Sequence, residues 1–174
     1  MNSPLVVVMG VSGAGKSTVG RRLAAALSVP FCDGDDLHPP ANIAKQSAGI
    51  PLVDADRFPW LDRIGGRLAE AAAGQGIVVA CSALRRSYRD RLRGWAPELL
   101  IVHLTARPTL LRERTEQRAG HFMPPALLPA QLATLEPPGA DEAAVSIDVG
   151  APVAQVVETA HAWVQQRIAE ARPQ

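Results

Sequence analysis

The stretch at residues 5–18, LVVVMGVSGAGKST, constrains the fold more than any other part of the chain. Leu5–Met9 is a short apolar run rich in valine, which predicts a strand buried on both faces of a sheet. The run ends in GVSGAGKS at residues 10–17, which fits the pattern G-x-x-x-x-G-K-[ST] of a phosphate-binding P-loop. Residues 18–27 then carry apolar side chains at helical spacing. Strand, glycine-rich loop and helix therefore follow in the order that the motif requires.

The residue types of this loop suit the binding of phosphate groups. Its three glycines allow backbone conformations closed to residues with a Cβ, so that successive N–H groups can surround phosphate oxygens. Lys16 is expected to reach the β- and γ-phosphates, and the Ser17 hydroxyl to ligate Mg²⁺. A glycine-rich turn with a stray lysine is the alternative, and the flanking strand and helix argue against it. The predicted nucleotide-binding residues are Gly10, Val11, Ser12, Gly13, Ala14, Gly15, Lys16, Ser17 and Thr18.

Length, charge and cysteine content limit the class of protein. The 174 residues suggest one domain with a full core. A net charge of +1 gives no reason to expect attraction to nucleic acid or to an anionic membrane. No apolar run is long enough to span a bilayer, and the start MNSPLVVVMG lacks the basic region of a signal peptide. Cys32 and Cys81 form no disulfide or zinc pattern, so a reducing cytoplasm is the expected location.

Beyond the first helix, apolar runs and helical stripes alternate along the chain. They predict strands at residues 29–32, 77–81, 99–104 and 145–149 and helices at residues 41–48, 56–73, 82–93, 108–118, 126–135 and 153–168. This alternation predicts an α/β fold with a central parallel five-stranded sheet, right-handed crossovers and helices on both faces. Ligands of such sheets bind at the carboxyl ends of the strands. The P-loop and the DGDDLH and CSALRR segments should therefore converge on one crevice.

Acidic residues after the second strand indicate how a bound nucleotide would be used. A motor or switch carries an apolar strand ending in Asp, but here the third strand ends in Cys81-Ser82, and no N-K-x-D segment for guanine is present. Asp33, Asp35 and Asp36 follow the second strand instead, as in small-molecule kinases of the shikimate and adenylate type. In those kinases one carboxylate supports Mg²⁺ and another faces the acceptor hydroxyl. The alternative is that Asp33 and Asp35 only form the turn.

Three longer segments resemble the gluconate kinase (gluconokinase) family of P-loop kinases. They are DGDDLHPPANIAKQSAGIPLVDADRFPWL, CSALRRSYRDRLR and RAGHFMPPALLPAQLATLEPPGADE, and with GVSGAGKS they cover most of the chain. The resemblance implies the P-loop kinase fold in a single domain over residues 1–174, with a mobile lid near residues 118–130. It also implies ATP- and Mg²⁺-dependent phosphorylation of D-gluconate at O6 to 6-phosphogluconate. The oligomeric state is not fixed by the sequence, although the family suggests a homodimer.

The resemblance suggests roles for residues on the nucleotide side. Lys16 and Ser17 would serve the phosphates and Mg²⁺, and Asp33 is similar in position to the Mg²⁺-supporting carboxylate. Arg114 and Arg118 lie where related kinases place lid arginines, which cover the nucleotide and neutralise the transferring charge. Lys16 and Arg118 are therefore predicted as catalytic residues, and Arg114 as a nucleotide-binding residue.

The acceptor side is predicted from the same segments. Asp35 resembles the carboxylate that meets the acceptor hydroxyl, and His38, Arg57 and His121 lie in motifs expected to face the substrate. The carboxylate of gluconate needs a cation, and the planar guanidinium fork can hold it through two parallel bonds. Arg57, or Arg86 after the third strand, is the candidate for this contact. The alternatives are that His38 only packs and that Arg57 is a solvated surface charge.

Other features of the sequence favour structural roles. The arginine-rich segment at residues 85–93 is expected to be a solvated helix with one or two site residues rather than a nucleic-acid patch. His103 and His161 are expected to be structural, and Trp60 and Trp95 to lie in the core or an interface. Two rival functions remain: a kinase for shikimate or another polyol acid, and a nucleotide-responsive switch without transfer activity.

Overall fold

The computed structural model describes residues 3–118, 120 and 124–171. Its strands are β1 (Leu5–Met9), β2 (Phe31–Asp33), β3 (Ile77–Ala80), β4 (Leu100–Thr105) and β5 (Ala144–Asp148). Its helices are α1 (Lys16–Leu27), α2 (Pro40–Ser47), α3 (Asp54–Ala72), α4 (Arg86–Trp95), α5 (Pro108–Glu116), α6 (Leu128–Thr134) and α7 (Val153–Glu170), with short 3₁₀ turns η1 (Gly34–Leu37) and η2 (Pro125–Leu127). Among the described residues, none of these helices has the length and apolar character needed to cross a membrane.

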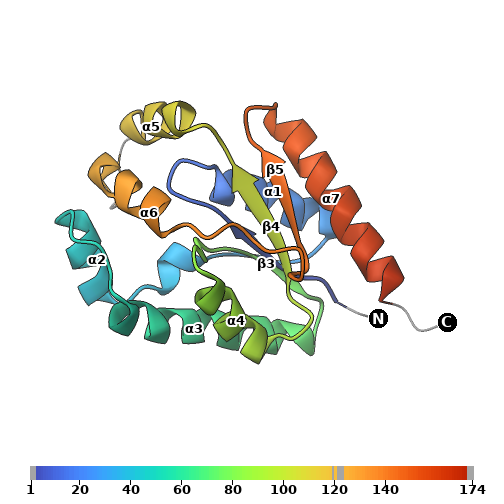
Figure 1. Cartoon of the computed structure of the whole chain (residues 1–174). Coiled ribbons are helices and arrows are strands. Elements are labelled where there is room, and N and C mark those ends of the chain that lie inside the picture. Colours follow the sequence, from blue (N-terminus) through green and yellow to red (C-terminus); the bar gives the residue numbers. More distant parts are fainter. Residues whose placement is uncertain (1–2, 119, 121–123, 172–174) are drawn as a thin grey trace.

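The five strands form one parallel sheet in the order β2-β3-β1-β4-β5. This confirms the predicted α/β fold with a central parallel five-stranded sheet. The central strand β1 pairs with β3 on one side and with β4 on the other. Its carboxyl end leads into the glycine-rich loop and then into α1 (Figure 1). The phosphate-binding motif therefore starts from the middle of the sheet.

The side chains of β1 alternate between two hydrophobic cores. Val6 and Val8 pack in the core that contains residues of α1 and α7, while Val7 and Met9 pack in the core that contains residues of α3 and α4. Figure 1 shows these two pairs of helices on opposite sides of the sheet. All four side chains are fully buried, and burying each one contributes about 1.5–3 kcal/mol. A strand that is apolar at every position is explained by this two-sided burial.

Several elements begin later than the sequence predicts, and for two of them the structure shows the reason. The second strand begins at Phe31 because the Val29 amide donates to the Ala24 carbonyl at the end of α1, at 3.0 Å. The helix expected over residues 82–93 begins at Arg86. Ala83 has a φ of 44°, which lies outside the right-handed helical region, so residues 82–85 form a loop. This loop lies at the carboxyl end of β3.

The arginine-rich helix α4 is solvated only in part. Arg89 is completely buried, which corrects the expectation of a solvated helix at this position. Trp60 lies in the core as expected, whereas Trp95 is 46% exposed. His103 is buried on β4, with Nδ1 3.1 Å from the Ser146 hydroxyl oxygen. Its structural role is thus consistent with the sequence analysis.

Candidate active site

The glycine-rich loop between β1 and α1 has the backbone shape of a phosphate-binding loop. Gly13 and Gly15 have φ values of 83° and 89°, in the left-handed region that residues with a Cβ rarely adopt. A Cβ on Gly13 would also lie 2.9 Å from the carbonyl oxygen of Leu111. Because α1 begins at Lys16, its first N–H groups and their partial positive charge lie at the loop. The loop therefore fits bound phosphate groups.

Two cavities meet beside this loop. One, of about 160 Å³, lies over the loop itself. The other, of about 40 Å³, is lined by residues of α3 and α6. Lys16, Asp35 and Arg118 line both cavities. Lys16 Nζ donates to the Val11 carbonyl at 3.1 Å, and burial lowers the pKa of its ammonium. Two cations and one carboxylate thus lie where the two cavities meet.

Ser17 and Asp33 form a pair of oxygen ligands beside the loop. The Ser17 hydroxyl donates to Asp33 Oδ2 at 2.6 Å, and Asp33 Oδ1 accepts the amide of Asp35 at 3.1 Å. Asp33 therefore caps the turn η1 and also reaches the P-loop, so the two roles considered for it are compatible. Mg²⁺ in kinases is held by one or two carboxylates together with substrate phosphates. Ser17 and Asp33 fit that pattern, and the described part of the chain has no cluster of three or more His, Cys, Asp or Glu residues that could hold a metal alone.

His38 is a buried side chain whose tautomer is set by a neighbour. Its ring stacks on Trp60 with centroids 4.1 Å apart, and burial lowers its pKa to about 4. Asn42 Nδ2 donates to the Asp56 carbonyl at 3.0 Å and lies 3.2 Å from His38 Nδ1. An amide nitrogen only donates, so Nδ1 accepts and the ring proton is on Nε2. Nε2 lies 4.0 Å from Asp35 Oδ1, on the side of the cavity. His38 therefore both packs and faces the site.

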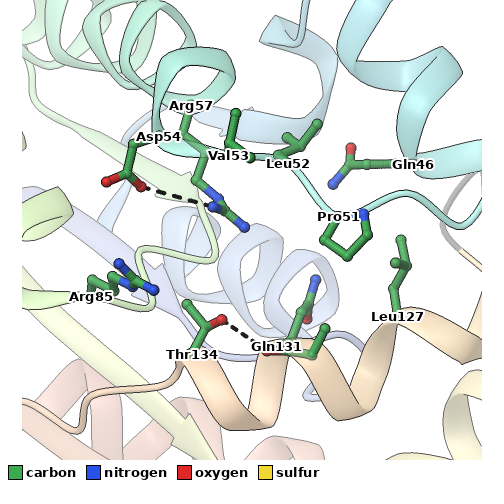
Figure 2. Close-up of a pocket in the computed structure, with 11 residues that line it drawn as sticks. Gln46, Pro51, Leu52, Val53, Asp54, Arg57, Arg85, Leu127, Gln131 and Thr134 are labelled. Atoms are coloured by element: carbon green, nitrogen blue, oxygen red, sulfur yellow. Dashed lines mark hydrogen bonds and ion pairs between the residues drawn. The ribbon is translucent and has the colours of Figure 1, made fainter.

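A wider cavity of about 360 Å³ adjoins the 40 Å³ cavity. The two share Gln46, Leu52, Arg57 and Gln131 as lining residues, and we call them together the inner cleft. Figure 2 shows the Arg57 guanidinium pointing into the space between Arg85 and Gln131. One wall of the inner cleft comes from α3 and the loop after β3, and the facing wall from α6.

Arg57 is held at the wall of the inner cleft by two neighbours. Its Nη1 donates to the Tyr88 hydroxyl at 3.2 Å and lies 4.0 Å from Asp54 Oδ1. The Tyr88 hydroxyl in turn donates to Asp54 Oδ1 at 2.6 Å. The Arg57 side chain is only 19% exposed, which argues against a solvated surface charge. A cation is therefore fixed beside the cavity.

Arg86 does not lie in the inner cleft, contrary to the sequence analysis. Its Nη1 donates to Asp141 Oδ1 at 2.8 Å, and its Nε lies 3.5 Å from Asp90 Oδ2. The residue before it, Arg85, lines the wider cavity instead. Neighbouring residues at the start of a helix point in different directions, so a shift of one position moves the cation out of the cleft. The fifth predicted acceptor residue, His121, lies outside the described residues.

An apolar pocket of about 310 Å³ adjoins the phosphate-binding loop and shares no lining residue with the inner cleft. Arg114 lines both this pocket and the cavity over the loop, and its Nη2 donates to the Val149 carbonyl at 3.0 Å. An apolar slot beside a phosphate site suits a flat, weakly polar ring. Its aliphatic lining residues are Ala14, Val19, Val149, Ala151, Val153 and Val156.

Besides Arg85, three site residues were missed by the sequence analysis: Asn42, Tyr88 and Gln131. The first sets the tautomer of His38, the second bonds Arg57, and the third accepts a hydrogen bond from the Ser12 amide at 2.7 Å. All three are uncharged, and none has a spacing that marks it as a ligand. All three lie in segments that carry the family resemblance, which is the one signal that could have drawn attention to them.

Taken together, the geometry suits the transfer of a phosphoryl group. The loop and α1 can hold the phosphates of a donor, and the inner cleft can hold an acceptor of moderate size. Lys16 and Arg118 can stabilise negative charge where the donor and acceptor meet, and Asp35 can accept a proton there. Phosphoryl transfer depends mainly on positioning and electrostatics of this kind.

Comparisons of the sequence identify the family. The AAA domain family matches residues 5–138. A gluconokinase from Gluconobacter oxydans is 52% identical over 143 residues, covering 82% of this chain and 80% of that protein. The thermosensitive gluconokinase of Escherichia coli is 45% identical over 154 residues, covering 87% of this chain and 82% of that protein.

Solved structures agree with the sequence comparisons. A gluconokinase from Sinorhizobium meliloti has a TM-score of 0.86 at 51% identity and covers 95% of this chain and 93% of its own. An unliganded sugar kinase from Janibacter has a TM-score of 0.89 at 41% identity, and the match covers 98% of this chain and 99% of that protein. An APS kinase from Mycobacterium tuberculosis shares the fold, with a TM-score of 0.69 at 16% identity. The chain is a kinase and belongs to the gluconokinase family of P-loop kinases.

Proposed function

We propose that this protein transfers the γ-phosphoryl group of ATP to O6 of D-gluconate, giving 6-phospho-D-gluconate and ADP. The observation that carries the proposal is that Lys16, Asp35 and Arg118 line both the cavity over the P-loop and the inner cleft. A phosphate in the first cavity and a hydroxyl in the second would meet at these three side chains. The choice of gluconate rests on the relatives named gluconokinases, at 52% and 45% identity.

The donor side is built by the loop, α1 and the apolar pocket. The loop amides and Lys16 would hold the β- and γ-phosphates, and the apolar pocket would hold the adenine ring. Ser17 and Asp33 would hold Mg²⁺, their oxygens being 2.6 Å apart. Bound Mg²⁺ neutralises charge on the phosphates. Arg114, at the border of the two cavities, would cover the nucleotide.

The reacting atoms belong to Asp35 and its neighbours. Asp35 would orient the O6 hydroxyl and take its proton as O6 forms its bond to the γ-phosphorus. The bond from that phosphorus to the β–γ bridging oxygen breaks, and ADP leaves with the electron pair. The His38 Nε2–H lies 4.0 Å from Asp35 Oδ1, so that a neutral ring rather than a second cation stands beside this carboxylate. Lys16 and Arg118 would balance the charge on the transferring group.

The far end of gluconate would lie in the wider cavity. Arg57 and Arg85 both line it, and a carboxylate can accept two parallel hydrogen bonds from one guanidinium. Arg85 therefore replaces Arg86 as the second candidate for the carboxylate contact. Glucose lacks this carboxylate and has a closed ring, so it should be a very poor acceptor.

Four further predictions belong to this proposal. They are the single domain, the lid over residues 118–130, the homodimer and the cytoplasmic location. Of the predicted lid, residues 119 and 121–123 lie outside the described part of the chain. Closure over the inner cleft would exclude water and so protect ATP from hydrolysis.

The test is ADP release with ATP and Mg²⁺ alone, and then with gluconate, glucose or shikimate. We expect release to require gluconate, and NMR of the product to place the phosphate on O6. Lys16→Met should lower kcat by about 10²-fold or more, about 3 kcal/mol of transition-state stabilisation. Lys45→Met is the matched control, because Lys45 pairs with Asp56 at 2.8 Å outside the cavities. Release without an acceptor, or preference for shikimate, would overturn the proposal.

A further inference from the structure

The side chain of Arg89 is completely buried, although the sequence analysis expected its helix to be solvated. Arg89 of α4 has no exposed surface. Its Nε and Nη2 donate to the two carboxylate oxygens of Glu142, at 2.7 Å and 2.8 Å. Burying a charge pair is costly, and such a pair is weak evidence for a purely stabilising role. Its remaining contacts indicate what else it does.

The third nitrogen of Arg89 connects two separate segments of the chain. Nη1 donates to the Ala83 carbonyl at 3.0 Å and lies 3.4 Å from the Leu84 carbonyl, both in the loop after β3. It also donates to the Glu136 carbonyl at 3.0 Å, just beyond the end of α6. The Glu136 amide donates back to the Leu84 carbonyl at 2.7 Å. A single guanidinium thus joins the loop after β3 to the end of α6.

These two segments form facing walls of the inner cleft. The loop contributes Ser82, Leu84 and Arg85 to its lining, and α6 contributes Gln131 and Thr134. The loop needs support because Ala83 has a left-handed φ of 44°, which is unfavourable for a residue with a Cβ. Glu142 is itself fixed, since it also accepts from Arg93 Nη2 at 2.6 Å and from the Gly139 amide at 3.0 Å.

We propose that Arg89, anchored by Glu142, is a positioning residue that sets the separation of the two walls of the inner cleft and so determines how tightly the acceptor is held. It does not touch the substrate, because it is fully buried behind the loop. The inference rests on the proposed function, in which the inner cleft holds gluconate. The phosphate-binding loop receives no hydrogen bond from Arg89 among the described contacts.

The test uses Arg89→Lys, which separates charge from geometry. A lysine keeps a cation beside Glu142, but one ammonium cannot hold the carboxylate and the carbonyls of both segments at once. We expect a folded protein whose KM for gluconate is about tenfold higher, with the KM for ATP within about twofold of the unchanged protein. The control is Arg91→Lys in the same helix, where Arg91 makes an exposed ion pair with Asp62 at 2.8 Å. It should leave both KM values unchanged.

Three results would overturn the inference. They are a gluconate KM within twofold of the unchanged protein in folded Arg89→Lys, equal increases in both KM values, or a change in melting temperature alone. Should Arg89→Lys not fold, Glu142→Gln decides, because it keeps the shape of the anchor and removes its charge; an unchanged gluconate KM in that variant also overturns the inference. Failure of the unchanged protein to phosphorylate gluconate would instead refute the proposed function, so the two failures are distinct.

Discussion

The Ser12 amide donates a hydrogen bond to Gln131 Oε1 at 2.7 Å, which joins the phosphate-binding loop to α6 across 119 positions of sequence. Gln131 also lines both cavities of the inner cleft. The donor loop and the acceptor wall therefore share one side chain. A substitution at Gln131 should therefore change the binding of both substrates.

Gln131→Met tests this link, because methionine has nearly the same length and no strong acceptor. A typical intramolecular hydrogen bond contributes about 0.5–1.5 kcal/mol, so we expect the KM values for ATP and for gluconate each to rise by about two- to tenfold. Steady-state kinetics with each substrate varied separately measures both values. Gln155→Met, at an exposed position of α7, is the matched control. An effect on one substrate only would show that the link does not couple them.

Asp33 and Asp35 lie two positions apart, but their substitution by asparagine should have different effects on activity. Asp35→Asn keeps the size of the side chain and removes the proton acceptor, so kcat should fall by about 10²–10⁴-fold while ATP still binds. Asp33→Asn weakens the oxygen pair with Ser17 and should raise the Mg²⁺ concentration needed for half-maximal activity. Kinetics at varied Mg²⁺ and nucleotide binding by fluorescence distinguish the two. If both variants only melt at lower temperature, the residues serve the turn alone.

Much of the donor side could be predicted from the sequence because its signals are local. The run Leu5–Met9, the glycines and Lys16 occupy consecutive positions, and each has one physical reason for its place. The alternation of strands and helices was enough to place Asp35 at the same edge of the sheet. No long-range contact had to be known to reach these conclusions.

The acceptor side depends on contacts that the sequence does not show. Whether Arg85 or Arg86 faces the inner cleft depends on where α4 begins, since one residue rotates a helix by about 100°. The burial of Arg89 depends on Glu142, which is far away in the sequence. Asn42 matters only because the folded chain brings His38 and Asp56 to it. Charge and spacing alone could not distinguish these cases.

His103 should make the stability of the protein depend on pH. Burial lowers its pKa from 6.5 to about 4, so between these values the unfolded chain binds more protons than the folded one. The contribution of neutral His103 to the free energy of unfolding is therefore fully present above about pH 6.5, and it is lost as the pH falls toward 4. His103→Leu removes this group, and its melting temperature should fall less between pH 7 and pH 5 than that of the unchanged protein, as thermal melts at each pH would show. His38, with a pKa also lowered to about 4, would account for part of the remaining loss. An identical drop in both proteins would contradict the assignment.

Arg57 should decide how an open-chain acid is chosen over a neutral sugar. Its guanidinium lies at the wall of the wider cavity, and a charge-assisted contact of this kind contributes about 1.5–3 kcal/mol. Arg57→Ala should therefore raise the KM for gluconate by about ten- to a hundredfold, at 1.4 kcal/mol per decade. The KM for ATP should change little, because Arg57 does not line the cavity over the P-loop.

Arg86→Ala is the matched control for Arg57→Ala. Arg86 makes exposed ion pairs with Asp141 and Asp90, and such pairs contribute about 0–1 kcal/mol to stability. Both KM values should stay within about twofold in this variant. Arg85→Ala, by contrast, should raise the KM for gluconate, because Arg85 lines the wider cavity. A raised gluconate KM in Arg86→Ala with an unchanged one in Arg57→Ala would move the carboxylate contact to α4. Unchanged values in all three variants, or equal use of glucose, would show that neither Arg57 nor Arg85 binds the carboxylate.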